Sequence, residues 1–434
     1  MSELNVLVLH RMGDPRYRRE AVRSLEYMIP ECRPDLNCIV HDSDLPFPDY
    51  LKDIDYHLIV LGPTFLCNRY DSTKFNKAKT AYAFIKEAQA CKIALPQDDY
   101  DCSAILDEWM VDWNVDCIYT VCTEHWGVLY PKSIKQIEIR LGYTGYISDK
   151  WIDAWKSPKT NFFRTVDVSY RASKLGANFG RVGQLKWEIA GRYKCAVKGR
   201  GNLQVDISID EKDLIPGSEW HGFLENSKFC LATPSGSSLL DPYGNIRNCV
   251  ERYSAIKPNA AFHEFEEKCF QGEDGKYCFV AISPRNIEAA LAETVQIATP
   301  SSYSNLMSSA EHYIPLHEDC GNIKEVLQMM KDESLILKMK RQCKESFLSE
   351  PRLRQKNIVN EIIGYSENQV TKKKIIVRNQ AVVDQLFYRY RSEINEIAAS
   401  FWRRKYFEQK IKSMAVYFGA RRVRNLIRPL IRKA

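Results

Sequence analysis

The stretch Ser283–Ile297 reads SPRNIEAALAETVQI and predicts a turn, then a helix, then a short apolar strand that begins near Val295. Arg285 and Glu288 fall in the first turn of that helix, three positions apart, and so on one face. A strand that follows a helix directly is typical of a parallel sheet, in which helices connect consecutive strands. The stretch therefore predicts an α/β fold.

The first 145 residues or so repeat this alternation. Short apolar segments bounded by turn residues predict strands at Asn5–His10, Asn37–Val40, Tyr56–Gly62, Cys91–Pro96 and Asp116–Val121. Helical segments lie between them, including 72–90 and 103–113. This order predicts a parallel sheet covered by helices on both faces, with ligands gathering at the carboxyl ends of its strands.

A second alternating region begins near residue 166. Strands are predicted at Val166–Arg171, Leu203–Ser208, Lys228–Pro234, Tyr277–Ser283, Val295–Thr299 and Glu311–Leu316, with a helix at Gln184–Ala196. We therefore expect two Rossmann-like domains that face a cleft. Residues 1–155 form the first, residues 156–365 the second, and residues 366–434 a basic helical tail.

Composition and charge narrow the class of protein. The chain has 434 residues, is 45% apolar and contains 14 cysteines, none in a paired C-x-x-C cluster. We expect free thiols, a reducing cytoplasmic compartment, no secretory leader and no membrane span. Residues 366–434 carry 17 Lys and Arg against 5 Asp and Glu, whereas the preceding residues are slightly acidic. This asymmetry predicts an anionic surface as partner of the tail.

Arg285 and Glu288 together suggest a grip on a nucleoside diphosphate. The first turn of a helix offers free N–H groups and the positive end of the dipole to a phosphate. Arginine adds bidentate phosphate contacts, and a glutamate one turn later can accept hydrogen bonds from two ribose hydroxyls. The alternative is an ordinary surface pair, worth under about 0.5 kcal/mol.

Two further segments are candidates for donor binding. The loop after the strand Val166–Arg171 contains glycines that permit close backbone approach and lysines and arginines that supply charge: Arg171, Lys174, Gly176, Gly180, Gly183 and Lys186. Its glycine spacing differs from G-x-G-x-x-G, which disfavours a nicotinamide-dependent oxidoreductase. The second segment contains Ser235, Gly236 and Ser237, which are small enough to line a sugar or its phosphates. Ordinary glycine-rich connections remain the alternative for the first loop.

The stretches SKFCLATPSGSSLLDPYGNIRN, AISPRNIEAALAETVQI and EHYIPLHEDCGNIKEVLQMMKD resemble, in this order, bacterial GT-B glycosyltransferases of the group 1 and spore-coat type. The resemblance covers roughly residues 90–350. It implies that Glu288 binds the donor ribose and that Arg285 lies at the diphosphate. Retaining members carry a second glutamate eight positions earlier, where this chain has Val280. That departure leaves the stereochemical outcome open.

An inverting transfer needs a general base near the acceptor hydroxyl. Acidic and imidazole side chains at the predicted strand ends of the first domain are candidates: His10, Asp98, Asp99, Glu124 and His125. We name Asp99 and His125, although adjacent acids after Pro96 are also typical of a helix cap. We expect no metal ion and no cofactor, since arginine and the helix dipole can meet the charge of the leaving group.

The tail allows three interpretations. It forms helices packed on the body with a solvated basic face, an interfacial helix on an anionic membrane, or a nucleic-acid-binding segment. We favour the membrane, because aromatic residues alternate with arginine and lysine around residues 401–418, and no nucleic-acid module is recognisable.

The predicted activity is transfer of a sugar from a nucleotide sugar, a UDP- or GDP-sugar, to a hydroxyl of a bacterial surface glycan. Lipopolysaccharide, capsule and exopolysaccharide are such glycans. The enzyme would work without metal at the inner face of the cytoplasmic membrane. The alternative is a GT-B-like protein without catalytic activity that binds a nucleotide or glycan as a scaffold of the same pathway.

Overall fold

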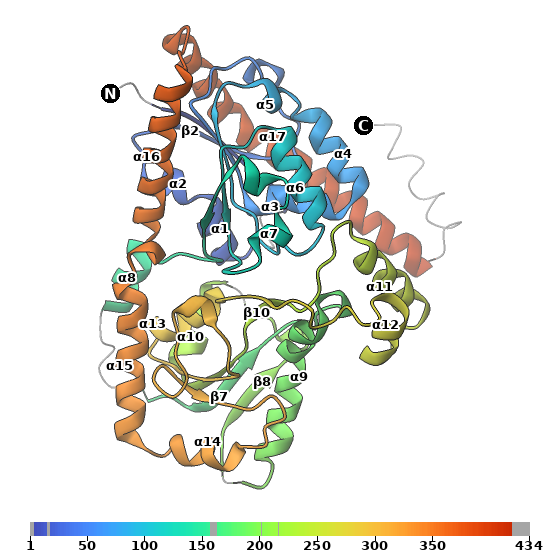
Figure 1. Ribbon diagram of the computed structural model, residues 1–434, viewed down its shortest axis with the longest axis vertical. Coiled ribbons are helices and arrows are strands. Elements are labelled where there is room, and N and C mark those ends of the chain that lie inside the picture. The colour runs from blue at the N-terminus through green and yellow to red at the C-terminus, as the bar shows by residue number, and fades with distance from the viewer. Residues whose placement is uncertain (1–3, 15–17, 157–162, 201, 216, 419–434) are drawn as a thin grey trace.

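The computed structural model describes residues 4–14, 18–156, 163–200, 202–215 and 217–418 (Figure 1). It contains two parallel sheets, one above the other in the view of Figure 1, each covered by helices. The expected GT-B architecture of two Rossmann-like domains is therefore confirmed.

The first sheet has six parallel strands in the order β2-β1-β3-β4-β5-β6. Their bounds are β1 Asn5–His10, β2 Asn37–Asp42, β3 Leu58–Leu61, β4 Cys91–Ala94, β5 Cys117–Thr120 and β6 Glu138–Leu141. The central strands are buried on both faces, as the continuous apolar runs predicted. Strand β6 was not predicted, because it is a half-exposed edge strand with the charged sequence EIRL.

Helices α1 to α8 follow the strands of this sheet or connect it to the second. Their bounds are α1 Glu20–Glu26, α2 Met28–Cys32, α3 Pro63–Leu66, α4 Ser72–Ala81, α5 Phe84–Glu87, α6 Ser103–Asp112, α7 Trp126–Leu129 and α8 Asp149–Lys156. The single helix predicted over 72–90 is two helices. It breaks after α4 because the buried Tyr82 turns into the core formed by Phe65, Trp109 and Trp113.

The second sheet has five parallel strands in the order β13-β12-β9-β7-β8. Their bounds are β7 Val166–Arg171, β8 Val205–Ser208, β9 Ser227–Ala232, β12 Val295–Ala298 and β13 Tyr313–Pro315. Strands β10 Ser235–Ser237 and β11 Phe279–Ala281 pair antiparallel with each other and stand apart from this sheet. The predicted strand over 277–283 thus forms, but not as a member of the main sheet.

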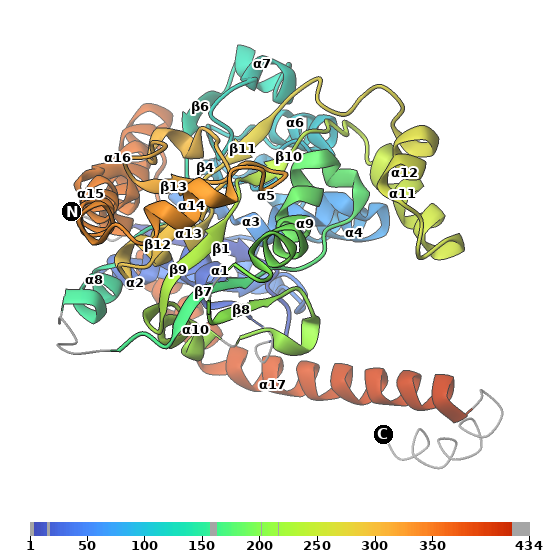
Figure 2. The same cartoon turned by 90° about the horizontal axis from the view of Figure 1, so that it is seen from below.

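The helices of the second region are α9 Gly180–Val197, α10 Gly217–Glu225, α11 Asn245–Ile256, α12 Phe262–Cys269, α13 Pro284–Leu291, α14 Ile323–Met329 and α15 Glu333–Ser349. Helices α11 and α12 lie between β10 and β11 and project to one side (Figures 1 and 2). A disulfide joins Cys249 of α11 to Cys269 of α12, with Cα atoms 5.5 Å apart. The expectation of free thiols is therefore wrong for these two cysteines, which packing of α11 against α12 brings together.

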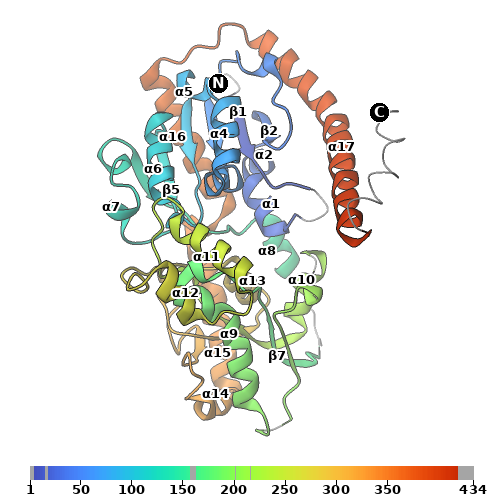
Figure 3. The same ribbon diagram turned by 90° about the vertical axis from the view of Figure 1, so that its right-hand side faces the viewer.

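The last two helices, α16 Gln355–Lys373 and α17 Gln380–Phe418, return to the first domain (Figure 3). The boundary predicted between 365 and 366 falls inside α16, whose Tyr365 hydroxyl donates to the Asp116 carbonyl. The first turns of α17 are also part of this domain, since Val383, Phe387 and Tyr390 are buried in its core. The separate tail thus begins later than the sequence suggested.

No helix of the described residues is long and apolar enough to cross a membrane.

Candidate functional site

A pocket opens at the carboxyl ends of β7 and β9, between α9, α10 and α13. We call it the cationic pocket. It is lined by Ser169, Tyr170, Arg171, Lys186, Trp220, Phe223, Leu224, Cys230, Leu231, Ala232, Thr233, Ser283, Arg285, Asn286 and Gln296. Parallel α/β sheets bind their ligands at this edge. The predicted residue Arg285 therefore lies where a ligand is expected.

Arg285 holds its guanidinium across the pocket wall. Its Nη1 donates to the carbonyl oxygen of Arg171 at 2.5 Å, and its Cζ lies 5.5 Å from the centre of the Trp220 ring. Burial lowers its pKa. It makes no ion pair with Glu288, although the two stand one turn apart. The surface-pair alternative is therefore wrong, because both side chains turn inward.

Glu288 is only 6% exposed and is satisfied by an aromatic neighbour. Its Oε2 accepts a hydrogen bond from Nε1 of Trp220 at 2.7 Å. Burial raises the pKa of Glu288 to about 7, while the Trp220 hydrogen bond and the Arg285 charge oppose the shift. One carboxylate oxygen of Glu288, to which the resemblance assigns a ribose hydroxyl, thus accepts from an indole N–H, and Glu288 is not among the residues that line the cationic pocket.

The start of α13 is already capped. Ser283 Oγ accepts from the backbone N–H of Arg285 at 3.4 Å, and Asn286 Oδ1 accepts from the N–H of Ser283 at 2.9 Å. The amides that the sequence offered to a phosphate are therefore partly occupied by the cap. The side chains of the pocket, more than the helix start, carry its positive charge.

Lys186, on the second turn of α9, is the cation without a partner. Among the residues that the structure describes, none forms a hydrogen bond or ion pair with its Nζ. Its pKa is lowered to about 8 by burial and further by the charges of Arg285 and Arg19, while Asp98 opposes the shift. An ammonium group held near other cations and away from water favours an anionic ligand.

Arg19 and Asp98 bring charges of the first domain to this pocket. Arg19 is the exposed N-cap residue of α1, and its charge lowers the pKa values of both Lys186 and Arg285. Asp98 follows β4, and its negative charge raises the pKa of Lys186. The electrostatics of the pocket therefore depend on both domains.

Arg171 lines the pocket, but its guanidinium is engaged. It forms an ion pair with Asp206 at 2.7 Å and donates to the carbonyl of Asp213 at 3.0 Å. Lys174 is exposed outside the lining, with its Nζ 4.8 Å from the centre of the Trp187 ring. The structure thus brings Arg171 and Arg285 together and leaves Lys174 apart.

The two predicted glycines pack inside the domain. Helix α9 begins at Gly180, four residues earlier than expected, so Gly180 and Gly183 are helical. Gly180 has φ +62°, and a Cβ there would lie 2.3 Å from Ser238 Oγ. A Cβ on Gly183 would lie 2.3 Å from the Cβ of Phe179. These glycines allow close packing of α9, and neither lines the cationic pocket.

Ser235, Gly236 and Ser237 form β10 rather than a ligand-binding loop. A Cβ on Gly236, whose φ is +146°, would collide with the carbonyl of Phe279 on β11. Ser237 is fully buried, and its hydroxyl donates to the carbonyl of Leu239. None of the three lines the cationic pocket, and the structure assigns them to the antiparallel pair of β10 and β11.

The two residues named as bases lie in different surroundings. Asp99 is fully buried, with its Oδ2 accepting from Thr120 Oγ1 and from the Tyr130 hydroxyl at 2.6 Å. Its Oδ1 has no hydrogen-bond partner among the described residues. His125 is half-buried with φ +65° and packs edge-on against Tyr277 and Phe279. Neither lines the cationic pocket.

A second hollow lies on the first domain. We call it the tyrosine hollow, and it is lined by Leu25, Pro63, Leu95, Pro96, Gln97, Tyr119, Val121, Gly142, Tyr143 and Tyr146. The segment that follows Gly142 joins it to the second domain, because Thr144 Oγ1 donates to the Ile282 carbonyl at 2.5 Å. That carbonyl is next to Ser283, which lines the cationic pocket. This hydrogen bond therefore links the segment after the tyrosine hollow to the residue before Ser283 of the cationic pocket.

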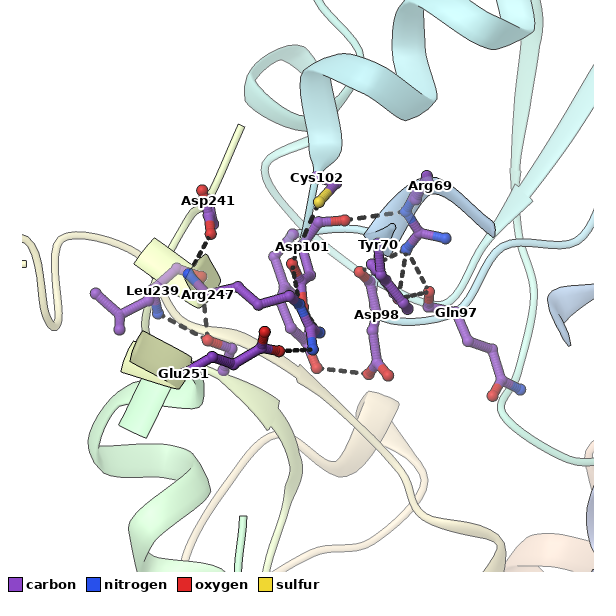
Figure 4. A network of polar contacts seen from close by, with 12 residues as sticks. Arg69, Tyr70, Gln97, Asp98, Asp101, Cys102, Leu239, Asp241, Arg247 and Glu251 are labelled. Atoms are coloured by element: carbon purple, nitrogen blue, oxygen red, sulfur yellow. Dashed lines mark hydrogen bonds and ion pairs between the residues drawn. The ribbon is translucent and has the colours of Figure 1, made fainter. Parts of the chain in front are cut away.

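A polar network also fixes the two domains to each other (Figure 4). Arg247 of α11 forms a bidentate ion pair with Asp101 of the first domain. The Asp241 N–H donates to the Tyr100 carbonyl at 2.9 Å, and the Ser103 N–H donates to the Asp241 carbonyl at 3.3 Å. This network holds the segment after β4 against the second domain.

Two features of the site were not found in the sequence. Trp220 lies in a helix with no recognisable motif, and nothing in the sequence indicates that its indole reaches a glutamate 68 positions later. Lys186 stood out only as one charge of a glycine-containing loop. Its position on the pocket side of α9 follows from the start of the helix at Gly180.

Known proteins resemble this chain in structure and not in sequence. No family model matches the sequence, and no curated protein does. Solved structures with similar folds include the pneumococcal O-GlcNAc transferase GtfA in complex with UDP and GlcNAc. It is 12% identical, with a TM-score of 0.42, over 72% of this chain and 57% of that one.

Two others match nearly their whole length. Anabaena HepE in complex with UDP-glucose is 11% identical, with a TM-score of 0.45, over 84% of this chain and 100% of that one. A DNA-modifying β-glucosyltransferase is 11% identical, with a TM-score of 0.46, over 83% of this chain and 99% of that one.

Proposed function

We propose that this protein is a glycosyltransferase that takes a sugar from a nucleotide sugar. The observation that carries the proposal is the cationic pocket, where Lys186 and Arg285 converge without a carboxylate partner. Cations held partly out of water destabilise a folded protein unless an anion joins them. A diphosphate supplies two negative groups at the distance of neighbouring side chains, and arginine binds it in a bidentate manner.

The tyrosine hollow supports transfer rather than binding alone. It lies at the carboxyl ends of β3 to β6, and the segment that follows it contacts the second domain, where Thr144 donates to the carbonyl of Ile282, the residue before Ser283. A donor in the pocket and an acceptor in the hollow would bring an anomeric carbon and a hydroxyl together, which supplies a large part of catalysis. Departure of the diphosphate is assisted by Lys186 and Arg285 without a metal ion.

The acceptor that we propose is a hydroxyl of a bacterial surface glycan on a lipid carrier. The support is α17, whose carboxyl half extends away from both domains (Figures 2 and 3). It presents aromatic side chains, including Phe407 at 62% exposed, beside the exposed Arg403, Arg404 and Lys405. Such a helix binds the interface of an anionic membrane, at the inner face of which the nucleotide sugar is available.

A non-catalytic scaffold that binds a nucleotide is the second candidate. It is favoured by Val280, which lies on β11 where the resemblance places a second glutamate in retaining enzymes. The two candidates share the diphosphate and differ in turnover.

The test measures thermal stabilisation by UDP, GDP, dTDP, CMP and NAD. We expect one nucleoside diphosphate to stabilise the wild type, and Lys186→Ala to lose at least tenfold in affinity for it, because the ammonium is the unpaired cation of the pocket. Lys194→Ala is the matched control, since Lys194 is exposed on the same helix two turns later. Equal affinities of Lys186→Ala and Lys194→Ala for the nucleoside diphosphate would show that the cationic pocket does not bind it. Binding without release of the diphosphate from any sugar nucleotide would favour the scaffold.

A further inference from the structure

Asp98 has an unusual backbone conformation for a residue that is not glycine. It follows β4 with φ +53°, in the left-handed region. Aspartate and asparagine tolerate this region better than other L-residues, and such a conformation persists where its surroundings impose it. The conformation is therefore a feature that the neighbouring side chains must maintain.

Arg69 is the residue that maintains it. This arginine is 2% exposed, and its Nη2 donates to the carbonyls of Gln97 and Asp98, both at 2.9 Å (Figure 4). Its Nε donates to the carbonyl of Asp101 at 3.0 Å. One buried guanidinium thus holds three backbone carbonyls of the segment after β4. Asp101 is in turn held by Arg247 of the second domain.

The carboxylate of Asp98 is held as firmly as its backbone. The hydroxyl of Tyr100, itself 4% exposed, donates to Asp98 Oδ1 at 2.5 Å. The other oxygen, Oδ2, accepts no hydrogen bond from the described residues. In Figure 4 the side chain extends from the first domain toward the second. One oxygen is therefore fixed and the other is available.

Asp98 and Asp99 point in opposite directions. Asp99 is enclosed by Thr120 and Tyr130, whereas Asp98 is exposed. The preceding residue, Gln97, lines the tyrosine hollow, and Asp98 acts electrostatically on Lys186 of the cationic pocket. The open carboxylate thus lies one residue after the lining of the tyrosine hollow and within electrostatic reach of Lys186.

We propose that Asp98 is the general base of the transfer, a role that rests on the proposed function. Its Oδ2 takes the proton of the acceptor hydroxyl while the hydroxyl oxygen forms a bond to the anomeric carbon. The bond from that carbon to the diphosphate oxygen breaks, and its electron pair leaves with the diphosphate beside Lys186 and Arg285. The products are a glycoside, a nucleoside diphosphate and one proton on Asp98. A base on the face opposite the leaving group gives inversion at the anomeric carbon.

Asp98→Asn is the appropriate variant. Asparagine tolerates positive φ as well as aspartate does, and its side-chain oxygen can still accept from Tyr100. The variant removes the charge and the proton-accepting oxygen while the fold remains intact. Glu108→Gln, at an exposed carboxylate on α6, is the control for loss of an acidic group in the same domain.

Three measurements separate the outcomes. Stabilisation by the nucleoside diphosphate tests the pocket alone. Release of the diphosphate from its sugar nucleotide, with water as the acceptor hydroxyl, tests turnover, and NMR of the freshly released sugar reports the anomer. We expect Asp98→Asn to bind the diphosphate within about twofold of wild type, and to lose at least a hundredfold in turnover. Glu108→Gln should match wild type, and the sugar should be released with inverted configuration.

Each contrary result is informative. Turnover of Asp98→Asn within threefold of wild type, or a sugar of retained configuration, would overturn the role of Asp98 while leaving the donor pocket intact. A wild type that binds the diphosphate but does not release it from a sugar nucleotide would also overturn this role. Absence of stabilisation by any nucleotide would instead overturn the proposed function itself.

Discussion

Replacing Glu288 by glutamine should stabilise this protein at alkaline pH. Burial raises the pKa of Glu288 from the ordinary value of 4.5 to about 7. A carboxyl group with a raised pKa in the folded state binds more protons folded than unfolded between these two values. Its contribution to stability is therefore greatest below pH 4.5 and is lost as the pH rises through 7.

The magnitude follows from the pKa. A pKa shift of one unit corresponds to about 1.36 kcal/mol of unfolding free energy. The buried Glu288 carboxylate therefore lowers the stability of the protein by about 3 kcal/mol at pH 8, and about 2–3 kcal/mol of this loss arises between pH 5 and pH 8. Glutamine carries no charge, and its oxygen can still accept from Trp220 Nε1. We therefore expect Glu288→Gln to raise the melting temperature at pH 8 by roughly 3–4 °C and to have a much smaller effect at pH 5.

The assay is thermal unfolding of wild type and variant from pH 5 to pH 8, with Glu325→Gln as control. Glu325 is exposed on α14, so its replacement should leave the pH profile unchanged. Glu26 is also buried, with a pKa raised to about 7, and for that reason the difference between variant and wild type is the quantity to compare. A variant that is less stable at pH 8, or whose pH profile parallels that of wild type, would refute burial of a titrating Glu288.

Two further predictions concern the joining of the domains and the outer helix. Arg247→Met leaves the carboxylate of Asp101, which is 5% exposed, without its ion-pair partner. The free energy of unfolding measured with urea should therefore fall by about 3 kcal/mol. Arg252→Met, on the exposed face of α11, should leave this free energy unchanged. Removing residues after 395 should release the protein from vesicles containing anionic lipid and leave its melting temperature unchanged; vesicle binding by the shortened chain would contradict the membrane role of α17. A cut after 378 is unsuitable for this test, because it also removes the buried side chains Val383, Phe387 and Tyr390.

The sequence predicted the elements whose pattern is local. Strands β1 and β7 occur with the bounds expected, and the helix and strand of 283–297 are α13 and β12. Buried parallel strands read as continuous apolar runs, and turn residues mark their ends. The edge strand β6 lacks that pattern, since two of its four residues are charged and its side chains are half-exposed.

The site was predicted less completely than the fold. It depends on the directions in which side chains point, and the spacing of residues in the sequence does not determine them. Asp98 and Asp99 are adjacent, and only the positive φ at Asp98 decides which carboxylate is exposed. Gly180 and Gly183 looked like a phosphate loop, yet a close approach of α9 to Ser238 and Phe179 explains both. The packing of α17 could not be foreseen either, since its buried residues contact strands more than 300 positions away.

Burial shifts the pKa of Lys186 and the pKa of Glu288 in opposite directions, to about 8 and to about 7. Both shifts disfavour the charged form, so each charge is costly in the protein without a ligand. Lys186 lines the cationic pocket, whereas Glu288 lies outside its lining and accepts a hydrogen bond from Trp220. Under the proposed function, the phosphates would pair with Lys186 and Arg285, and the ribose hydroxyls would reach Glu288 only by displacing the indole. An inorganic phosphate would compensate the cations as well, so only a ligand that also displaces the indole would lower the cost of the Glu288 charge.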